Sequence, residues 1–146
     1  FLNASARGAI LGATLETSKS DVARAFFESL AHAIRECLVA AEVQPTSLAL
    51  SGGGAQNDFW CQVIADVTGL PTTRTSDSEV GSKGALIYAA IATGLSSNLS
   101  EACKRFVSPG DSFTPNESRK DLLDQAHNNF LKTRDALLTS VWSEEN

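Results

Sequence analysis

Short apolar runs alternate with longer segments of helical periodicity over residues 6–94, and this alternation constrains the fold more than any other feature of the sequence. The predicted strands are short apolar or Thr-rich runs bounded by Gly and Pro, and the predicted helices carry apolar side chains every three or four residues. We predict strands at 6–14, 47–51 and 71–75, and helices at about 20–43, 57–69 and 80–93. Because short connections join these segments, we expect an α/β fold with right-handed crossovers.

The first predicted helix begins at Ser20 or Asp21 and ends near Val43, ahead of Pro45. Its buried side is predicted from apolar side chains at a four-residue spacing, namely Val22, Phe26, Leu30, Ile34 and Leu38. Ser78 is predicted to be the N-cap of the helix at 80–93. Two more helices are predicted at 99–107 and about 119–142, and the intervening 108–118, which contains Pro and Gly, is predicted to be a surface connection.

Composition excludes several classes of protein. The chain has 146 residues, with 12 basic and 17 acidic side chains and a net charge of -5, which argues against a nucleic-acid partner. Apolar residues make up 42% of the sequence, yet no apolar run approaches the roughly 18 residues of a membrane span. The start of the sequence does not resemble a signal peptide, and we expect the chain to be part of a longer protein.

The three cysteines are odd in number and lack the spacing of a metal site or a disulfide framework. Cys37, Cys61 and Cys103 lie within apolar, helix-like stretches, so we predict buried free thiols and a cytoplasmic location, where the environment is reducing. Cys61 is predicted to pack beside Trp60 rather than act as a nucleophile, because no neighbouring base is identifiable.

A glycine loop directly follows the second predicted strand. Gly52, Gly53 and Gly54 precede Ala55 and Asn57, which stand at the start of the next helix. Glycines permit positive φ and let a ligand approach bare backbone, and amides at a helix start favour an anion or a hydrogen-bond acceptor. In an open α/β sheet such a loop lies in the ligand crevice. The loop lacks the Lys-Ser/Thr of a Walker loop and the third glycine of a dinucleotide fingerprint.

Two interpretations of Asn57 are open at the level of sequence: its side chain caps the following helix, or it faces a bound ligand. Glu79 is predicted to be a first-turn acid that complements a helix dipole, in preference to a catalytic carboxylate. His32 and His127 are predicted to be core or solvated histidines, since neither has an obvious partner in the sequence.

Taken in order, these segments resemble the C-terminal domain of the FGGY carbohydrate kinases, a family that includes xylulokinase, glycerol kinase and ribulokinase. The segments that carry the resemblance are ARGAILGAT at 6–14, VARAFFESLAHAIRECL at 22–38, LALSGGGAQNDFWCQVIADVTGLPTTRT at 48–75, SEVGSKGALIYAAIATGL at 78–95 and FTPN at 113–116. Lys83 departs from the family, which more often has a small or apolar residue there, and we predict that it is exposed to solvent.

The resemblance implies part of an ATP-dependent sugar or polyol kinase with the ribonuclease-H-like (actin-like ATPase) fold. It implies that the backbone of Gly53 contacts ATP, that the side chain of Asn57 is directed toward adenine, and that Gly52, Gly54 and Ala55 shape the same wall. Mg²⁺ would bridge the nucleotide phosphates. The general base, the phosphate contacts and the sugar site would lie upstream, so no catalytic residue and no metal ligand is named in this chain.

The resemblance also implies a division of the chain and a set of partners. Residues 1–116 would form the nucleotide-binding part of the C-terminal domain, and 117–146 a helical extension of the same domain. The partners would be a sugar or polyol and the upstream N-terminal domain, with homo-oligomer formation left open. The segment at 6–14 would close an antiparallel meander whose other strands lie upstream, so the sheet is expected to be incomplete.

Two alternatives come from other functional classes. A noncatalytic ATP-binding regulatory protein of the same fold would keep the adenine wall and lack the base. A dinucleotide-binding domain ranks last, because Thr75 stands where that class has an acidic residue.

Overall fold

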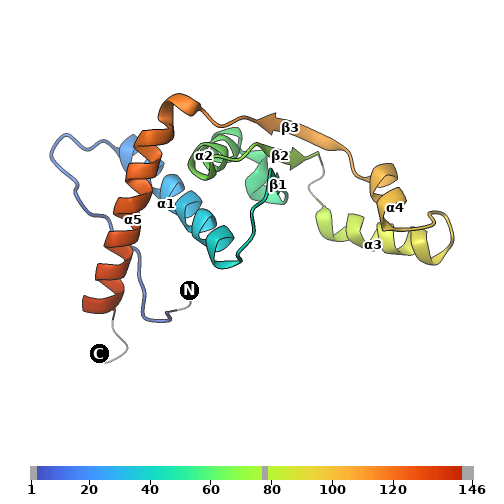
Figure 1. Cartoon of the computed structure of the whole chain (residues 1–146), viewed down its shortest axis with the longest axis horizontal. Helices are drawn as coiled ribbons and strands as arrows, with labels where there is room; N and C mark the ends of the chain where they lie inside the picture. The colour runs from blue at the N-terminus through green and yellow to red at the C-terminus, as the bar shows by residue number, and fades with distance from the viewer. Residues whose placement is uncertain (1–2, 77–78, 143–146) are drawn as a thin grey trace.

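Five α-helices and a small sheet make up the structure, a computed structural model that describes residues 3–76 and 79–142 (Figure 1). In chain order the elements are α1 (Lys19–Ala40), β1 (Leu48–Leu50), the 3-10 helix η1 (Gly53–Gln56), α2 (Asp58–Thr68), β2 (Thr72–Thr75), α3 (Val80–Ala92), α4 (Leu99–Phe106), β3 (Pro109–Phe113), η2 (Glu117–Arg119) and α5 (Lys120–Ser140). The five helices and the strands at 47–51 and 71–75 are confirmed to within about three residues. Ser78, the predicted N-cap of the helix at 80–93, lies outside the described residues.

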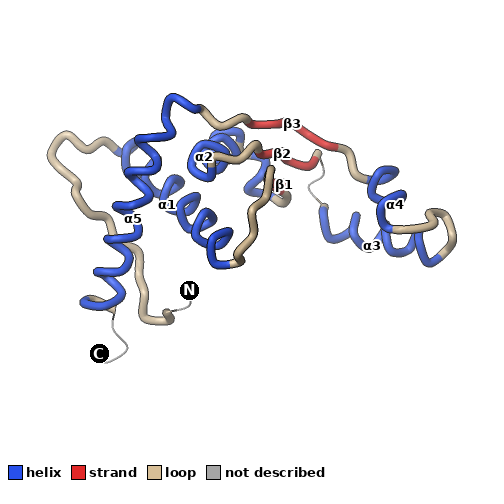
Figure 2. Tube along the Cα trace, in the orientation of Figure 1, coloured by secondary structure: helices blue, strands red, loops and turns tan. Residues whose placement is uncertain are grey.

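The sheet has three strands in the order β1-β2-β3 (Figure 2). β1 and β2 are parallel, with Leu48 opposite Thr72, and β3 runs antiparallel to β2, with Phe113 opposite Thr72. β1 therefore has a neighbour on one side only within the described chain. The expectation of an incomplete sheet is confirmed.

The core lies where α1, α2 and α5 meet beside β1. Its buried members are Ala31, Val63, Ile64, Val67 and Leu123, and Phe27, Ile34, Leu48, Leu50 and Trp60 pack against them. α2 supplies most of this core because both of its faces are covered, by α1 and α5 on one side and by the sheet on the other. At the opposite end of the molecule α3 and α4 form a separate pair, joined to the rest through β2 and β3 (Figure 1).

The strand predicted at 6–14 is absent, and this prediction is wrong. The segment is irregular, and its two largest apolar side chains, Ile10 and Leu11, are 71% and 64% exposed. An extended segment becomes a strand only when a neighbour accepts its backbone hydrogen bonds, and the described residues offer this segment none.

The surface connection predicted at 108–118 is also partly wrong, since it contains β3. The sequence of this strand, PGDSF, shows no alternation of apolar and polar residues, which is why the pattern does not reveal it. Pairing with β2, rather than intrinsic preference, makes it a strand.

α1 differs from its prediction at its cap and at its buried face. Ser18 is the N-cap, and it forms a capping box with Asp21. Phe26 and Leu30 are 62% and 42% exposed, whereas Ala31 is fully buried. A strict four-residue spacing advances about 40° per step around a helix of 3.6 residues per turn, so the predicted residues cannot all face the core: Phe26 and Leu30 lie on the exposed side, whereas Ile34 packs against the core. Cys37 lies on the exposed side for the same reason, against prediction.

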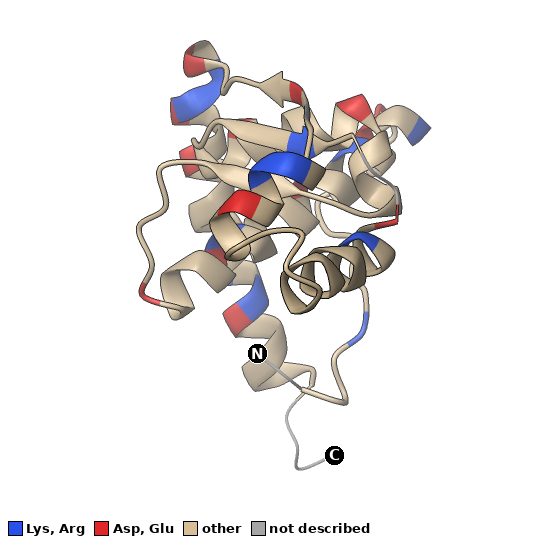
Figure 3. Ribbon diagram, turned by 90° about the vertical axis from the view of Figure 1, so that its right-hand side faces the viewer, with Lys and Arg blue, Asp and Glu red and all other residues tan. Residues whose placement is uncertain are grey.

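Acidic and basic positions are interspersed over the ribbon (Figure 3). In the described part of the chain, no helix is both long and apolar enough to cross a membrane.

Candidate nucleotide site

The glycine loop joins β1 to α2, as the sequence predicts. Gly52 has φ 85° and ψ -176°, a region of backbone space that is essentially restricted to glycine. After this turn the chain forms η1, in which Ala55 N donates to Gly52 O at 3.1 Å and Asn57 N donates to Gly54 O at 3.2 Å. The loop is therefore a short, internally hydrogen-bonded turn in front of α2.

Within this turn, the two glycines of η1 face different surroundings. A Cβ atom built on Gly53 would meet nothing within 4 Å, whereas one built on Gly54 would lie 3.7 Å from the Trp60 ring. Gly53 thus leaves its backbone open on the solvent side, and Gly54 faces an aromatic side chain of the same protein. An open backbone edge of this kind suits a ligand that packs flat against the chain.

Asn57 caps α2, and the capping interpretation is confirmed. Its Oδ1 atom accepts a hydrogen bond from Trp60 N at 3.0 Å, and its backbone oxygen accepts from Cys61 N at 3.0 Å. Its side chain is exposed, and among the described residues its Nδ2 amide makes no hydrogen bond. The cap uses the oxygen alone, so the two interpretations of Asn57 are compatible.

Ala55 lies at the back of the turn and is held from two sides. It is 4% exposed, and its carbonyl oxygen accepts from Cys61 Sγ and from Arg74 Nη1, each at 3.3 Å. Cys61 is fully buried, which confirms it as a packing residue, and burial raises the pKa of its thiol. Ala55 is therefore held through its backbone carbonyl and does not face solvent.

Arg74 of β2 connects the turn to the sheet. Its Nη1 atom also bonds Asp58 Oδ1 at 2.6 Å, and its Nη2 atom pairs with Asp111 of β3. The hydrogen bonds that Arg74 donates to Asp111 and Asp58 raise the pKa of Arg74. The sequence does not reveal this cluster, because Arg74, Asp58 and Asp111 are far apart in it and the pattern of residues 109–113 does not predict β3.

The charge at the loop is acidic, because the two carboxylates of Asp58 and Asp111 outnumber the one guanidinium of Arg74. The Asp58 side chain, in the first turn of α2, is 75% exposed. A carboxylate at a helix N-terminus satisfies the helix dipole, and it opposes a second anion at the same place. The mouth of the loop therefore suits an uncharged group better than a phosphate.

Similarity to known proteins identifies the family of this chain. The family model described as the FGGY family of carbohydrate kinases, C-terminal domain, matches residues 1–93. The chain belongs to the FGGY family of carbohydrate kinases. Two glycerol kinases of Streptococcus pneumoniae, from strain CGSP14 and from serotype 19F strain G54, are each 33% identical over 129 residues, which is 84% of this chain and 26% of each relative. The chain thus spans about a quarter of the length of these FGGY relatives.

Solved FGGY kinases share the fold. A gluconate kinase from Lactobacillus acidophilus superposes with a TM-score of 0.84 at 26% identity, over 94% of this chain and 28% of that one. A xylulose kinase from the same organism gives 0.83 at 25% identity, over 95% of this chain and 29% of that one. The chain therefore has part of the actin-like ATPase fold of these FGGY kinases, with a small incomplete sheet.

The remaining candidates of the FGGY chain lie away from the loop. Glu79 is the exposed N-cap residue of α3, and Lys83 is half-buried in the same helix, against the prediction of full exposure. Among the described residues, no group of three or more His, Cys, Asp or Glu side chains could hold a metal ion.

His32 and His127 meet between α1 and α5, with their Nδ1 atoms 3.2 Å apart. Both are buried, and the Nε2 atom of His127 lies 3.1 Å from Glu36 Oε1. The prediction of core histidines is confirmed. Their pairing could not be foreseen, because it depends on how α5 packs against α1.

Proposed function

We propose that this chain forms the adenosine-binding wall of an ATP-dependent sugar or polyol kinase, in a complete protein that supplies the rest of the active site. The observation that carries the proposal is the pair formed by Gly53 and Asn57. Gly53 leaves its backbone open, with no atom within 4 Å of its Cβ position, and Asn57 presents an exposed amide at the next turn. A flat heterocycle with acceptor nitrogens, such as adenine, matches an open backbone edge beside an amide donor.

The charges support a division of labour within the kinase. Asp58 disfavours a phosphate at the mouth of the loop, so we assign the γ-phosphate, Mg²⁺ and the general base to the part of the protein outside this chain. Phosphoryl transfer depends on positioning and on charge neutralisation more than on covalent chemistry. Gly52, Gly54 and Ala55 fix the shape of the wall that orients the adenosine end.

The acceptor class follows from the relatives, whose names refer to glycerol, xylulose and gluconate. We accordingly propose a sugar or polyol as acceptor and the upstream domain as the partner that closes on this chain. The free thiols support a cytoplasmic location. The noncatalytic alternative has no support among these relatives, all of which are named as kinases.

We also propose that residues 117–146 extend the same domain. Leu123 of α5 lies in the same buried cluster as Val63 and Ile64 of α2, which supports a single domain.

The test measures ADP release by the complete protein with ATP and, separately, glycerol, xylulose and gluconate. We expect acceptor-dependent ADP release with at least one carbohydrate. Gly53→Ala adds a methyl group on the open side, and we expect it to raise KM for ATP roughly tenfold. Gly54→Ala, whose methyl group would face Trp60, is the matched control and should raise KM less. Equal effects of the two variants would contradict the assignment of the wall.

A further inference from the structure

Arg74 is the most heavily engaged side chain near the loop. One guanidinium contacts the Ala55 carbonyl oxygen, the Asp58 carboxylate and the Asp111 carboxylate, and it lies 5.7 Å from the centre of the Phe113 ring. Its side chain is only 18% exposed. Arg74 therefore connects four elements: β2, which carries it, and η1, α2 and β3.

The two loop acceptors of Arg74 lie on either side of Asn57. Ala55 O is two residues before Asn57, and Asp58 immediately follows it. A planar guanidinium presents its donors in a fixed arrangement, so it sets the distance between these two acceptors in a way that a flexible ammonium cannot. The backbone that displays the Asn57 amide is thereby held at both ends.

β3 is shaped around Arg74. Thr73 pairs with Ser112 and Thr75 pairs with Pro109, so both Gly110 and Asp111 lie opposite Arg74. This is a β-bulge, a feature that redirects side chains and is frequent beside active sites. A Cβ atom on Gly110 would lie 2.7 Å from Arg74 O, so glycine at 110 permits the close approach that brings Asp111 to the guanidinium.

We propose that Arg74 is a positioning residue of the nucleotide site, which acts by holding the turn that carries Gly53 and Asn57 against β3. The inference rests on the proposed function of the loop. Arg74 does not touch the nucleotide, and its effect is exerted through the placement of the Ala55 carbonyl and the Asp58 carboxylate. Its loss lets the turn move relative to the rest of the site, which lowers affinity for the adenosine end.

The experiment compares Arg74→Lys and Arg74→Ala in the complete kinase, with ATP varied at saturating acceptor. Arg119→Lys is the matched control, because Arg119 is similarly half-buried (25% exposed) and bonds two carboxylates, those of Glu28 and Asp66, away from the loop. We expect both Arg74 variants to raise KM for ATP roughly tenfold with a smaller change in kcat. Arg74→Lys, which keeps the charge, should not restore KM, and Arg119→Lys should leave it unchanged.

The KM for the carbohydrate acceptor provides a second readout. KM for the carbohydrate should stay within the range of wild type in both Arg74 variants, since the acceptor binds elsewhere. If Arg74→Lys shifts KM for ATP no more than Arg119→Lys does, the positioning role is rejected while the proposed function stands. If the wild-type complete protein neither binds nor consumes ATP, the proposed function is rejected, and the role of Arg74 with it.

Discussion

Asn57 is the residue at which sequence and structure inform each other most. The sequence allows its side chain to be a helix cap or a ligand contact. In the structure, the Oδ1 atom of Asn57 caps the helix and the Nδ2 amide is exposed. Sequence alone could not separate the two ends of the side chain, because which atom faces the helix depends on the path of the preceding turn. Whether the amide contacts adenine stays a prediction.

Substitutions at Asn57 can separate these two ends. Asn57→Asp keeps an oxygen that accepts from Trp60 N and removes the amide donor, so it should preserve stability and weaken ATP binding. Asn57→Ala should weaken binding and also lower the free energy of unfolding by about 1 kcal/mol. Thermal unfolding without nucleotide and ATP affinity by calorimetry, measured on the complete protein, check both effects. Normal ATP affinity in Asn57→Asp would mean that Asn57 only caps α2 and does not contact the nucleotide.

The histidine pair is a second residue-scale feature, and it responds to pH. Burial and the nearby His127 lower the pKa of His32 from its ordinary value of 6.5 to about 4. The pKa of His127 is also lowered, chiefly by burial, although Glu36 opposes this shift. A consistent arrangement of protons has His127 donating from Nε2 to Glu36 and accepting at Nδ1 from His32.

We expect acid to weaken the packing of α5 against α1. Between pH 6.5 and about 4 the unfolded state binds a proton at residue 32 that the folded state does not, so stability falls as the pH is lowered through this window. His32→Phe removes that proton while keeping a ring beside Phe130, and its melting temperature should depend less on pH than that of wild type. Melting curves of the complete protein at pH 7.5 and pH 5 test this. Parallel pH profiles for wild type and variant would rule it out.

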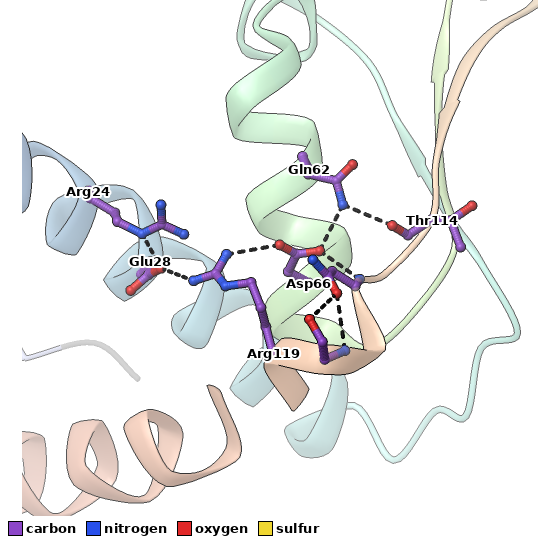
Figure 4. A network of polar contacts seen from close by, with 8 residues as sticks. Arg24, Glu28, Gln62, Asp66, Thr114 and Arg119 are labelled. Atoms are coloured by element: carbon purple, nitrogen blue, oxygen red, sulfur yellow. Dashed lines mark hydrogen bonds and ion pairs between the residues drawn. The ribbon is translucent and has the colours of Figure 1, made fainter. Parts of the chain in front are cut away.

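At the scale of elements, a polar network joins α1, α2 and the start of α5 (Figure 4). Asp66 of α2 is buried and accepts from Gln62 Nε2, the backbone N of Asn116 and Arg119 Nη1. Arg119 also bonds Glu28 of α1 at 3.0 Å. This network fixes the direction in which the chain enters α5.

Removing Arg119 should destabilise the protein, because it leaves the buried Asp66 carboxylate short of a partner. For Arg119→Ala we expect the free energy of unfolding to fall by about 1–3 kcal/mol. Arg24 bonds the same oxygen of Glu28 at 2.9 Å but is 43% exposed, so Arg24→Ala should cost less, about 0–1 kcal/mol. Urea titration of both variants in the complete protein checks the order. A larger loss in Arg24→Ala would contradict it.

The elements found from sequence share one property: each is identified by local signals. α2 has its cap at Asn57, its apolar periodicity and Gly69 at its end, and both β1 and β2 are apolar or Thr-rich runs bounded by Gly and Pro. The two failures depend on distant partners. β3 is a strand because β2 pairs with it, and 6–14 is not a strand because no described neighbour pairs with it.

At the scale of the whole molecule, two separate features lack a partner within the described chain. Ile10, Leu11 and Leu15 of the irregular N-terminal segment are exposed, and β1 has one free edge within the described chain. Exposed apolar side chains and an unpaired strand edge each favour association with another surface. The relatives, of which this chain matches 26%, contain enough further chain to provide that surface.

The last prediction follows from this open edge. In this chain residues 7–14 are exposed and β1 has an unpaired edge, so the backbone amides there are open to water. We therefore expect the isolated 146-residue chain to show rapid amide exchange at 6–14 and at β1, and to lack sugar-dependent ADP release. In the complete protein the same amides should be protected, because neighbouring strands then accept their hydrogen bonds. Hydrogen exchange followed by mass spectrometry of both forms measures this difference. Equal protection in the two forms would mean that the chain folds independently of the remaining protein, with 6–14 irregular in both.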